Sequence, residues 1–163
     1  MKKVTGALAA SGLLVAGGLC WAPIALAADG PPSAAGDWVT ADHEAVVEIA
    51  PCGSGFCGKL VGLRHNHPPG EVPKDVHNSD ASKRDVPLCG LMMLGSFKPV
   101  AGNPNKWEDG WAYDPDSGST YSGNLQLDGP NTLKLRGYIG ISLFGRTEIW
   151  TREGPEPHNR CTA

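Results

Sequence analysis

Residues 124–136, NLQLDGPNTLKLR, decide the fold class of this chain. Leu125 and Leu127 alternate with polar residues, and Leu133 and Leu135 do so again after the Asp-Gly-Pro-Asn turn. A period of two is typical of strands that have one buried face and one solvated face. Such strands belong to antiparallel sheets, because the strands of parallel sheets are apolar on both faces.

The same alternation recurs along the chain. Val47 and Ile49 alternate with their neighbours, as do Val61 and Leu63, and turn residues separate the runs. The spacing favours a meandering barrel or sandwich of about eight strands, an all-β fold. We expect strands over residues 36–41, 44–50, 57–64, 89–98, 106–113, 119–127, 132–139 and 144–152.

One long segment, residues 65–88, interrupts the strand pattern. It contains four prolines and shows no hydrophobic period. Asn78-Ser79 is expected to cap a short helical turn through Asp80–Arg84. Long loops in compact domains are often lids or binding elements, and the alternative is an ordered cover over one barrel end.

The N-terminus has the organisation of a secretory signal peptide over residues 1–27. Lys2 and Lys3 form a positive start, residues 4–19 carry no charge, and Ala25-Leu26-Ala27 matches a small-x-small cleavage site. An uncleaved anchor would need about 20 apolar residues that stay helical, which the glycines and a proline in this stretch disfavour.

Cleavage near Ala27 is expected to release the protein into the periplasm or the medium, with no membrane span. A flexible leader over residues 28–35 would then precede a single domain over residues 36–163. The net charge of the chain, −3 at pH 7, becomes −5 when the two signal lysines are lost. A mildly acidic chain without a Lys/Arg-rich run gives no indication of nucleic-acid binding.

Four cysteines remain after the signal: Cys52, Cys57, Cys89 and Cys161. An even number in an exported chain predicts disulfides. Cys52 and Cys57 flank a Gly-Ser-Gly turn whose two ends should lie close enough to bridge, and by elimination Cys89 pairs with Cys161. A four-thiolate zinc site is disfavoured by the loose spacing and by an oxidising compartment.

Several long motifs follow one another in a fixed order. They are Gly36-Asp37-Trp38; Cys52…Cys57-Gly58; Asp75-x-His77-Asn78 with Arg84-Asp85-x-Pro87-Leu88-Cys89-Gly90-Leu91; Trp107-x-x-Gly110-x-x-Tyr113-Asp114-Pro115-x-x-Gly118-x-x-Tyr121; and Leu135-Arg136-Gly137-Tyr138 with Leu143-Phe144-Gly145-Arg146-Thr147-x-x-Trp150-Thr151-Arg152. In these motifs the chain resembles the exported bacterial family catalogued as domain of unknown function 2147. The family name carries no activity, so the resemblance implies a fold: an antiparallel, lipocalin-like (calycin-type) β-barrel.

Lipocalin-type barrels resemble one another in a Gly-x-Trp on the first strand and an Arg near the last. Trp38 and Arg152 stand at those places. The guanidinium is expected to pack across the indole and close one barrel end, a contact that contributes about 0.5–2 kcal/mol. Both residues would then be structural.

The last expected strand bears on ligand binding. Arg146, Glu148 and Trp150 share one of its faces, and Ile149 lies on the other. If Trp150 points inward, the interior has a charged wall that suits a ligand with an apolar body and a polar head. If Ile149 points inward, these charges lie in water. The sequence leaves both arrangements open.

Aromatic residues are the other candidates for lining a cavity: Trp107, Trp111, Tyr113 and Tyr121. Alternating positions cannot all face inward, so only part of this set can contact a ligand. Because an eight-stranded barrel can hold one small ligand, the leading hypothesis is a periplasmic binding protein for a small apolar or amphipathic molecule.

Asp75, Asn78 and Arg84 form a polar cluster in the long segment. Arg84 could clamp a carboxylate or phosphate, with Asp75 orienting it. Alternatively, Asp75 and Arg84 pair with each other while Asn78 caps the turn, and this structural interpretation is favoured.

Three histidines in the same segment, His65, His67 and His77, are weak candidates for binding zinc, copper or nickel. They lie in a proline-rich loop without fixed ligand spacing, so we expect neither a metal nor another cofactor.

An enzyme is disfavoured, because the sequence has no nucleophile elbow, phosphate-binding glycine loop or zinc-protease motif. Two alternatives to a carrier stay open. One is a barrel filled by its own side chains that acts as an envelope assembly or stress factor, its protein partner unknown. The other is a hydrolase or isomerase that uses cavity carboxylates. A pocket of about 300 Å³ or more would favour a carrier over a filled barrel.

Overall fold

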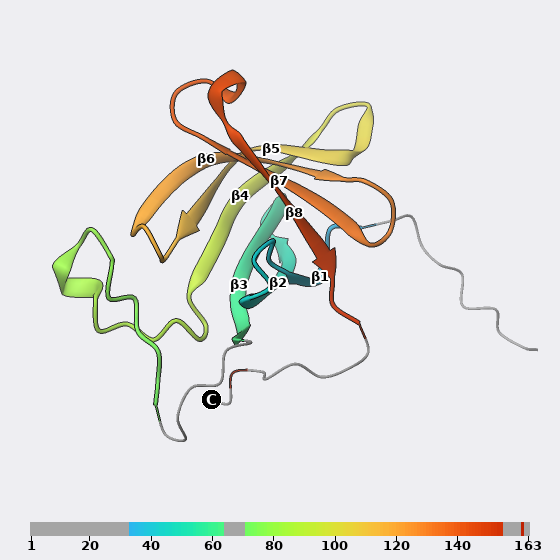
Figure 1. Cartoon of the computed structure of the whole chain (residues 1–163). Coiled ribbons are helices and arrows are strands. Elements are labelled where there is room, and N and C mark those ends of the chain that lie inside the picture. Colours follow the sequence, from blue (N-terminus) through green and yellow to red (C-terminus); the bar gives the residue numbers. More distant parts are fainter. Residues whose placement is uncertain (1–32, 64–70, 155–160, 162–163) are drawn as a thin grey trace, which may run out of the picture.

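Eight strands, each hydrogen-bonded to its neighbours in sequence order, close into an antiparallel barrel in the computed structural model of the chain (Figure 1). The structure describes residues 33–63, 71–154 and 161. Its strands are β1 (Gly36–Val39), β2 (Ala45–Cys52), β3 (Gly55–Leu63), β4 (Met92–Val100), β5 (Asn103–Asp114), β6 (Ser119–Leu127), β7 (Thr132–Tyr138) and β8 (Arg146–Arg152). The expected all-β barrel is confirmed, and each strand begins and ends within three residues of its expected position.

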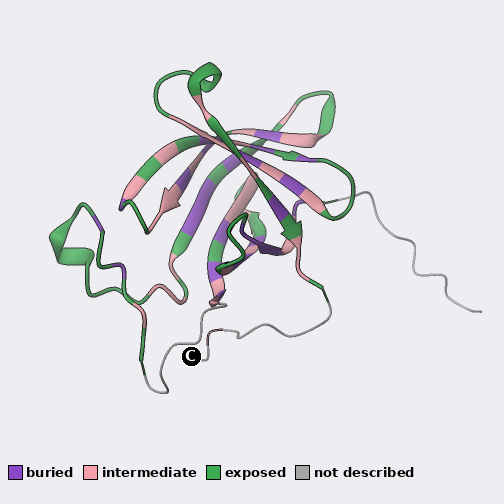
Figure 2. Cartoon of the chain, in the orientation of Figure 1, coloured by how far each residue is buried: buried purple, intermediate pink, exposed green. Residues whose placement is uncertain are grey.

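The alternation in the sequence sets the register of β6 against β7. Leu125 lies opposite Leu135, and Leu127 lies opposite Leu133, so all four side chains point into the barrel. Figure 2 shows buried positions alternating with more exposed ones along the strands. This is the pattern of a sheet that curls around one apolar core.

The expected helical turn in the long segment is present as a 3-10 helix, η1 (Ala81–Lys83). Its cap differs from the expectation of Asn78-Ser79. Asp80 is the cap, and its carboxylate accepts hydrogen bonds from the N–H and the hydroxyl of Ser82. The hydroxyl bond and then the N–H bond lower the pKa of Asp80. Asn78 supports this cap, because its side-chain oxygen accepts from the Asp80 N–H at 2.9 Å.

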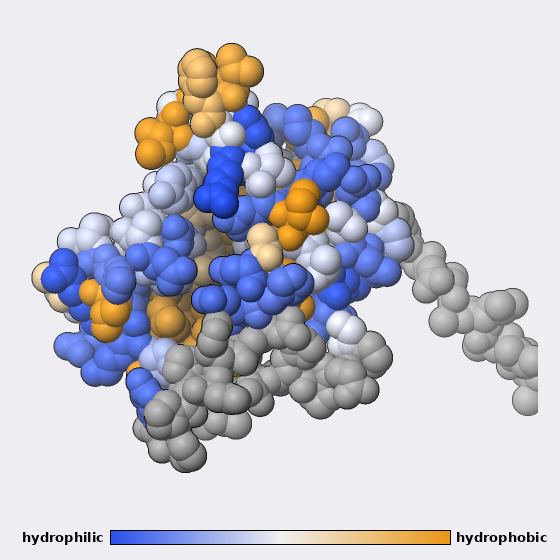
Figure 3. Space-filling model, viewed as in Figure 1, coloured by the Kyte–Doolittle hydropathy of each residue, from blue (hydrophilic) through white to orange (hydrophobic). Residues whose placement is uncertain are grey.

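A second 3-10 helix, η2 (Ser142–Phe144), occupies the loop before β8. Strand β8 was expected to begin at residue 144 and begins at Arg146 instead. Arg136 on β7 stabilises the loop, because its guanidinium donates to the carbonyl oxygens of Ser142 and Leu143 at 2.7 and 3.1 Å. The loop carries four apolar side chains that are 58–81% exposed, and they gather at the top of Figure 3: Ile139, Ile141, Leu143 and Phe144.

The two barrel ends differ. The end that carries the β2–β3, β4–β5 and β6–β7 turns, here called the closed end, is sealed by Trp38, whose indole N–H donates to the Ala34 carbonyl at 2.8 Å. Arg152 lies over this indole at 4.2 Å from the ring centre, and its guanidinium donates to the carbonyls of Ser33, Ala35 and Pro130. The end that carries the β1–β2, β5–β6 and β7–β8 connections is here called the open end.

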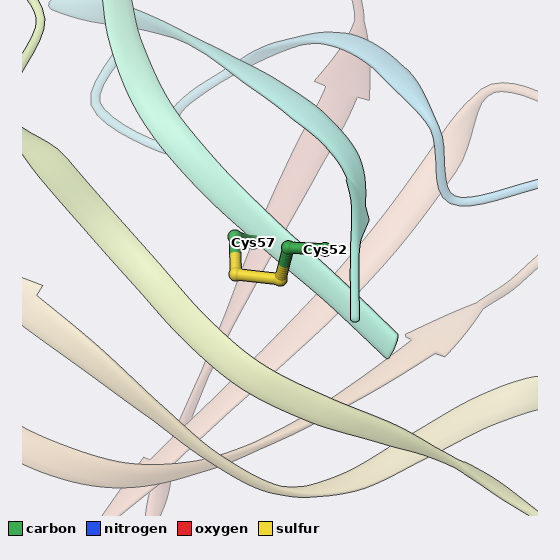
Figure 4. Close-up of a disulfide and its surroundings, with 2 residues drawn as sticks. All are labelled: Cys52 and Cys57. Carbon is green, nitrogen blue, oxygen red and sulfur yellow. A yellow bond between two sulfur atoms is a disulfide. The ribbon is translucent and has the colours of Figure 1, made fainter. Parts of the chain in front are cut away.

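Both expected disulfides are present. The hairpin disulfide joins Cys52 to Cys57 across the β2–β3 turn, with a Cα–Cα distance of 5.7 Å (Figure 4). The long-range disulfide joins Cys89 to Cys161 at a Cα–Cα distance of 5.6 Å, and the Cys161 N–H also donates to the Val61 carbonyl on β3. Among the described residues, no helix has the length and apolarity needed to cross a membrane.

Candidate ligand cavity

A cavity of about 450 Å³ occupies the barrel interior toward the open end. Its deeper part is apolar, and the residues that line this part come from five strands: Leu60, Met93, Leu94, Ala112, Leu135 and Trp150. Its mouth is polar, and the residues there are Thr40, Asp42, Glu44, Asp114, Asp116, Arg146 and Glu148. A volume of this size lies within the range of about 300–1,000 Å³ typical of small-molecule sites.

Strand β8 presents its Trp150 face to the interior. Trp150 is 3% exposed, whereas Ile149 is 45% exposed. The Trp150 indole N–H donates to the Glu148 carboxylate at 3.2 Å, which fixes that carboxylate against the cavity wall. Arg146 and Glu148 line the cavity together with Trp150, so the wall is charged.

Two of the four candidate aromatic residues on β5 and β6 line the cavity, and two do not. Tyr113 and Tyr121 are lining residues. Trp107 lies instead in the packed core, where its ring meets the edge of Phe56 at 5.3 Å. Trp111 packs on the outer surface of the barrel over Gly95, its partner on β4.

A β-bulge separates the two tryptophans. The β5–β6 register shifts between Trp107 and Gly110, and Asp109 in this bulge has a positive φ of 59°. An extra residue in one strand reverses the alternation beyond it. Consequently Trp107 and Ala112, five residues apart, both face inward and Trp111 faces outward. Neither tryptophan lines the cavity, so the part of the aromatic set that lines it is Tyr113 and Tyr121.

Of the acidic residues at the mouth, Glu148 was a candidate from the sequence, whereas Asp42, Glu44, Asp114 and Asp116 were not. The carboxylate oxygens of Asp42, Glu44 and Asp116 lie within 4.8 Å of one another, and all three residues are exposed. Oxygen ligands of this kind suit hard cations such as Ca²⁺, but exposed acidic groups are also common without an ion. The expected meander topology could have indicated these acids, because every second connection of a meander lies at the same barrel end.

The histidine candidates contribute little to this site. His65 and His67 lie outside the described residues, and His77 places its Nδ1 at 3.0 Å from the Asp116 carbonyl oxygen. That contact holds the segment 71–91 against the β5–β6 turn.

Asp75 is the most deeply buried acid of the described residues, with 1% of its surface exposed. It accepts hydrogen bonds from the Tyr113 hydroxyl, at 2.7 and 2.9 Å to its two oxygens, and from the Asn78 amide at 2.6 Å. Burial, and then the contact with Asp75, raise the pKa of Tyr113 to about 12. Arg84 donates to the Asn78 carbonyl at 2.9 Å, so its link to Asp75 runs through Asn78 and is not the direct pair that was expected.

The segment 71–91 is thus attached to the barrel at two places. Beside β3, the Leu60 N–H donates to the Leu91 carbonyl and the Gly90 N–H donates to the Leu60 carbonyl. Beside the β5–β6 turn, it is held by the Asp75–Tyr113 contact described above. Figure 1 shows the rest of the segment projecting to the left of the barrel, and Leu88 contributes to the cavity wall.

Comparison with known proteins agrees with this fold. The family model described as "uncharacterized protein conserved in bacteria (DUF2147)" matches residues 36–152. The chain belongs to the DUF2147 family. No curated protein sequence matches it. Among solved structures, this DUF2147 chain is similar to HP1028 from Helicobacter pylori, which is described as a member of the lipocalin family, with a TM-score of 0.66 and 19% identity.

The alignment with HP1028 covers 77% of this chain and 86% of that one. At this identity the likeness concerns the fold, so the lipocalin-like architecture is what the DUF2147 chain shares with it. The chemistry of the cavity depends on the residues of this chain. An apolar floor beneath a polar mouth can exclude water from one part of a bound molecule while it leaves another part solvated.

Proposed function

We propose that this protein is an exported, lipocalin-like carrier that holds one small amphipathic molecule inside its barrel. The observation that supports this is the cavity of about 450 Å³, with an apolar floor around Leu94, Leu135 and Trp150 and a charged mouth. The signal-like N-terminus and the two disulfides support a periplasmic or secreted location.

Burial of the apolar body would supply most of the binding free energy. At about 25 cal/mol per Å², burying on the order of 250 Å² of ligand surface contributes about 6 kcal/mol. Part of this is lost to the reduced translational and rotational freedom of the ligand. The polar mouth would then determine the orientation of the ligand and add little to its affinity.

The alternative of a barrel filled by its own side chains fits less well. Such a barrel would leave no room of this size, and some of the residues that line the cavity are too small to fill it. Ala112 and Gly137 both line it, at positions where longer side chains would close the interior.

Mature protein purified from the periplasm and examined by native mass spectrometry tests the proposal. A bound small molecule is expected, and denaturing extraction would identify it. In Ala112→Phe, which places a ring inside the cavity, the bound molecule should be lost. It should persist in Ala101→Phe, a matched change at an exposed position of the β4–β5 turn at the closed end.

An apo mass in repeated preparations, together with no binding of any alkyl probe to the purified protein, would reject the carrier function. Equal retention of the molecule in the Ala112 and Ala101 variants would place its site outside the barrel and would reject the function as well.

A further inference from the structure

We infer that the ligand of this cavity carries a positively charged head group, such as an alkylammonium, and is not an anion of the fatty-acid type. The inference rests on the proposed carrier function and names the ligand class for the same cavity. Its basis is the balance of charge around the mouth. Five carboxylates line the cavity, and they are Asp42, Glu44, Asp114, Asp116 and Glu148.

The acids come from three parts of the chain that are distant in sequence. The β1–β2 connection supplies Asp42 and Glu44, the end of β5 and the β5–β6 turn supply Asp114 and Asp116, and β8 supplies Glu148. Arg146 is the one cationic side chain among the described residues that line the cavity. An anionic head group entering the mouth would therefore meet more like charge than opposite charge.

The spacing of these acids strengthens the preference. With carboxylate oxygens of Asp42, Glu44 and Asp116 within 4.8 Å of one another, the mouth has a concentrated negative potential. Low-dielectric walls focus such a potential into a cleft. A cation placed between these groups reduces their mutual repulsion, whereas an anion adds to it.

Aromatic residues line the cavity together with the acids. Two of them are Tyr121 and Trp150, and Trp150 belongs to the apolar floor. The Trp150 indole N–H is bonded to Glu148, so a carboxylate and an aromatic ring are held side by side on one wall. Aromatic faces attract quaternary ammonium groups within about 6 Å, and carboxylates complement them.

A second hollow beside the cavity is acidic too. It has a volume of about 540 Å³ and lies between the β1–β2 connection and β8. The two hollows share Asp42, Asp114, Asp116, Arg146 and Glu148. A ligand that passes through this side opening meets the same excess of carboxylates before its apolar part reaches the floor.

Three probes with the same alkyl chain test the inference: dodecyltrimethylammonium, dodecyl maltoside and dodecyl sulfate, each used below its micelle concentration. Isothermal titration of the mature protein at constant ionic strength is expected to give a dissociation constant at least tenfold lower for the ammonium than for the sulfate. Added salt should weaken binding of the ammonium and leave binding of the neutral maltoside nearly unchanged.

The double variant Asp116→Asn with Glu148→Gln should lose most of the preference for the ammonium and keep its affinity for the maltoside, which also reports that the barrel is folded. Asp128→Asn is the matched control, because it removes a negative charge at the closed end, where Asp128 pairs with Lys134. It should leave all three affinities unchanged.

Equal or tighter binding of the sulfate would overturn the inference while leaving the carrier function in place. A preference for the ammonium that persists in the double variant would also overturn it. If none of the three probes binds, the inference and the carrier function both fail.

Discussion

The hydrogen bonds between Tyr113 and Asp75 make the attachment of the segment 71–91 directly testable. Asp75 is nearly inaccessible. Among the described residues, Tyr113 is the one barrel residue that donates a hydrogen bond to its carboxylate, since Asn78 belongs to the segment itself. Tyr113→Phe removes a single oxygen atom and keeps the ring, so it creates almost no cavity. The change isolates the hydrogen bonds to the buried carboxylate.

The expected loss in the free energy of unfolding follows from those contacts. A hydrogen bond to a charged group contributes about 1.5–3 kcal/mol, and a buried acceptor that loses its partner retains its full desolvation cost. We therefore expect Tyr113→Phe to destabilise the protein by about 2 kcal/mol. Hydrogen exchange of amides in the segment 71–91 should accelerate more than exchange in β6 and β7, because the substitution weakens the attachment of this segment.

Urea unfolding followed by circular dichroism measures the first quantity, and hydrogen exchange with mass spectrometry measures the second. Tyr121→Phe is the control. Its hydroxyl is exposed and lies 3.5 Å from Ser117 Oγ, so the loss should stay below about 0.5 kcal/mol. A double-mutant cycle with Asp75→Asn should give a coupling of about 1 kcal/mol or more between Tyr113 and Asp75. If Tyr113→Phe behaves like the control in both measurements, these hydrogen bonds do not hold the segment and our account of its attachment is wrong.

Three further predictions concern stability. The pKa of Tyr113 is raised from 10 in the unfolded chain to about 12 in the fold, so the free energy of unfolding should fall as pH rises from 10 to 12. The loss should be about 1–2 kcal/mol after allowance for solvent screening. Tyr113→Phe should remove this part of the pH profile, which urea unfolding measures. The long-range disulfide spans 72 residues, and replacing both of its cysteines by serine should lower the free energy of unfolding by about 4 kcal/mol. The same change in the hairpin disulfide, which spans 5 residues, should lower it by about 2 kcal/mol. Equal losses would contradict the chain-entropy argument. Arg152→Lys should lower the melting temperature. An ammonium keeps the charge over Trp38 but cannot donate to three separate carbonyls in the same geometry. An unchanged melting temperature would mean that the contacts of Arg152 at the closed end add nothing to stability.

The β6–β7 hairpin was predictable because its sequence allows one arrangement only. Leu125 and Leu133 lie on apolar faces that alternate with polar ones without interruption, so a register slip of one residue would expose the leucines. The sequence did not determine which face of β8 points inward, because Trp150 on one face and Ile149 on the other are both apolar. Packing against the rest of the barrel decides between them, and that packing depends on strands far away in the sequence.

The aromatic residues of β5 show a second limit. The sequence reasoning assumed a period of two through the strand, and the bulge at Asp109 breaks that period between Trp107 and Trp111. Asp42 and Asp116 were not among the candidates for a third reason: each lies in an ordinary turn, and only the closed barrel brings the two turns together. The alternation of apolar and polar residues thus predicts the strands, whereas the composition of the cavity mouth depends on how the closed barrel brings distant turns together.

The short contact between β1 and β8 explains why the mouth is polar. Among the described residues, β1 pairs with β8 only at Trp38–Arg152 and Val39–Thr151, although β8 continues back to Arg146. The backbone groups of β8 on that side, from Arg146 to Trp150, therefore pair with no strand in the part of the chain that the structure describes, and they need water. A side opening that must stay wet cannot be lined by apolar side chains alone, so charged residues such as Glu148 are compatible with it. For the proposed amphipathic ligand, the same condition separates its two parts. The polar head would lie in this wet opening, because only the apolar body is stabilised by leaving water for the dry floor.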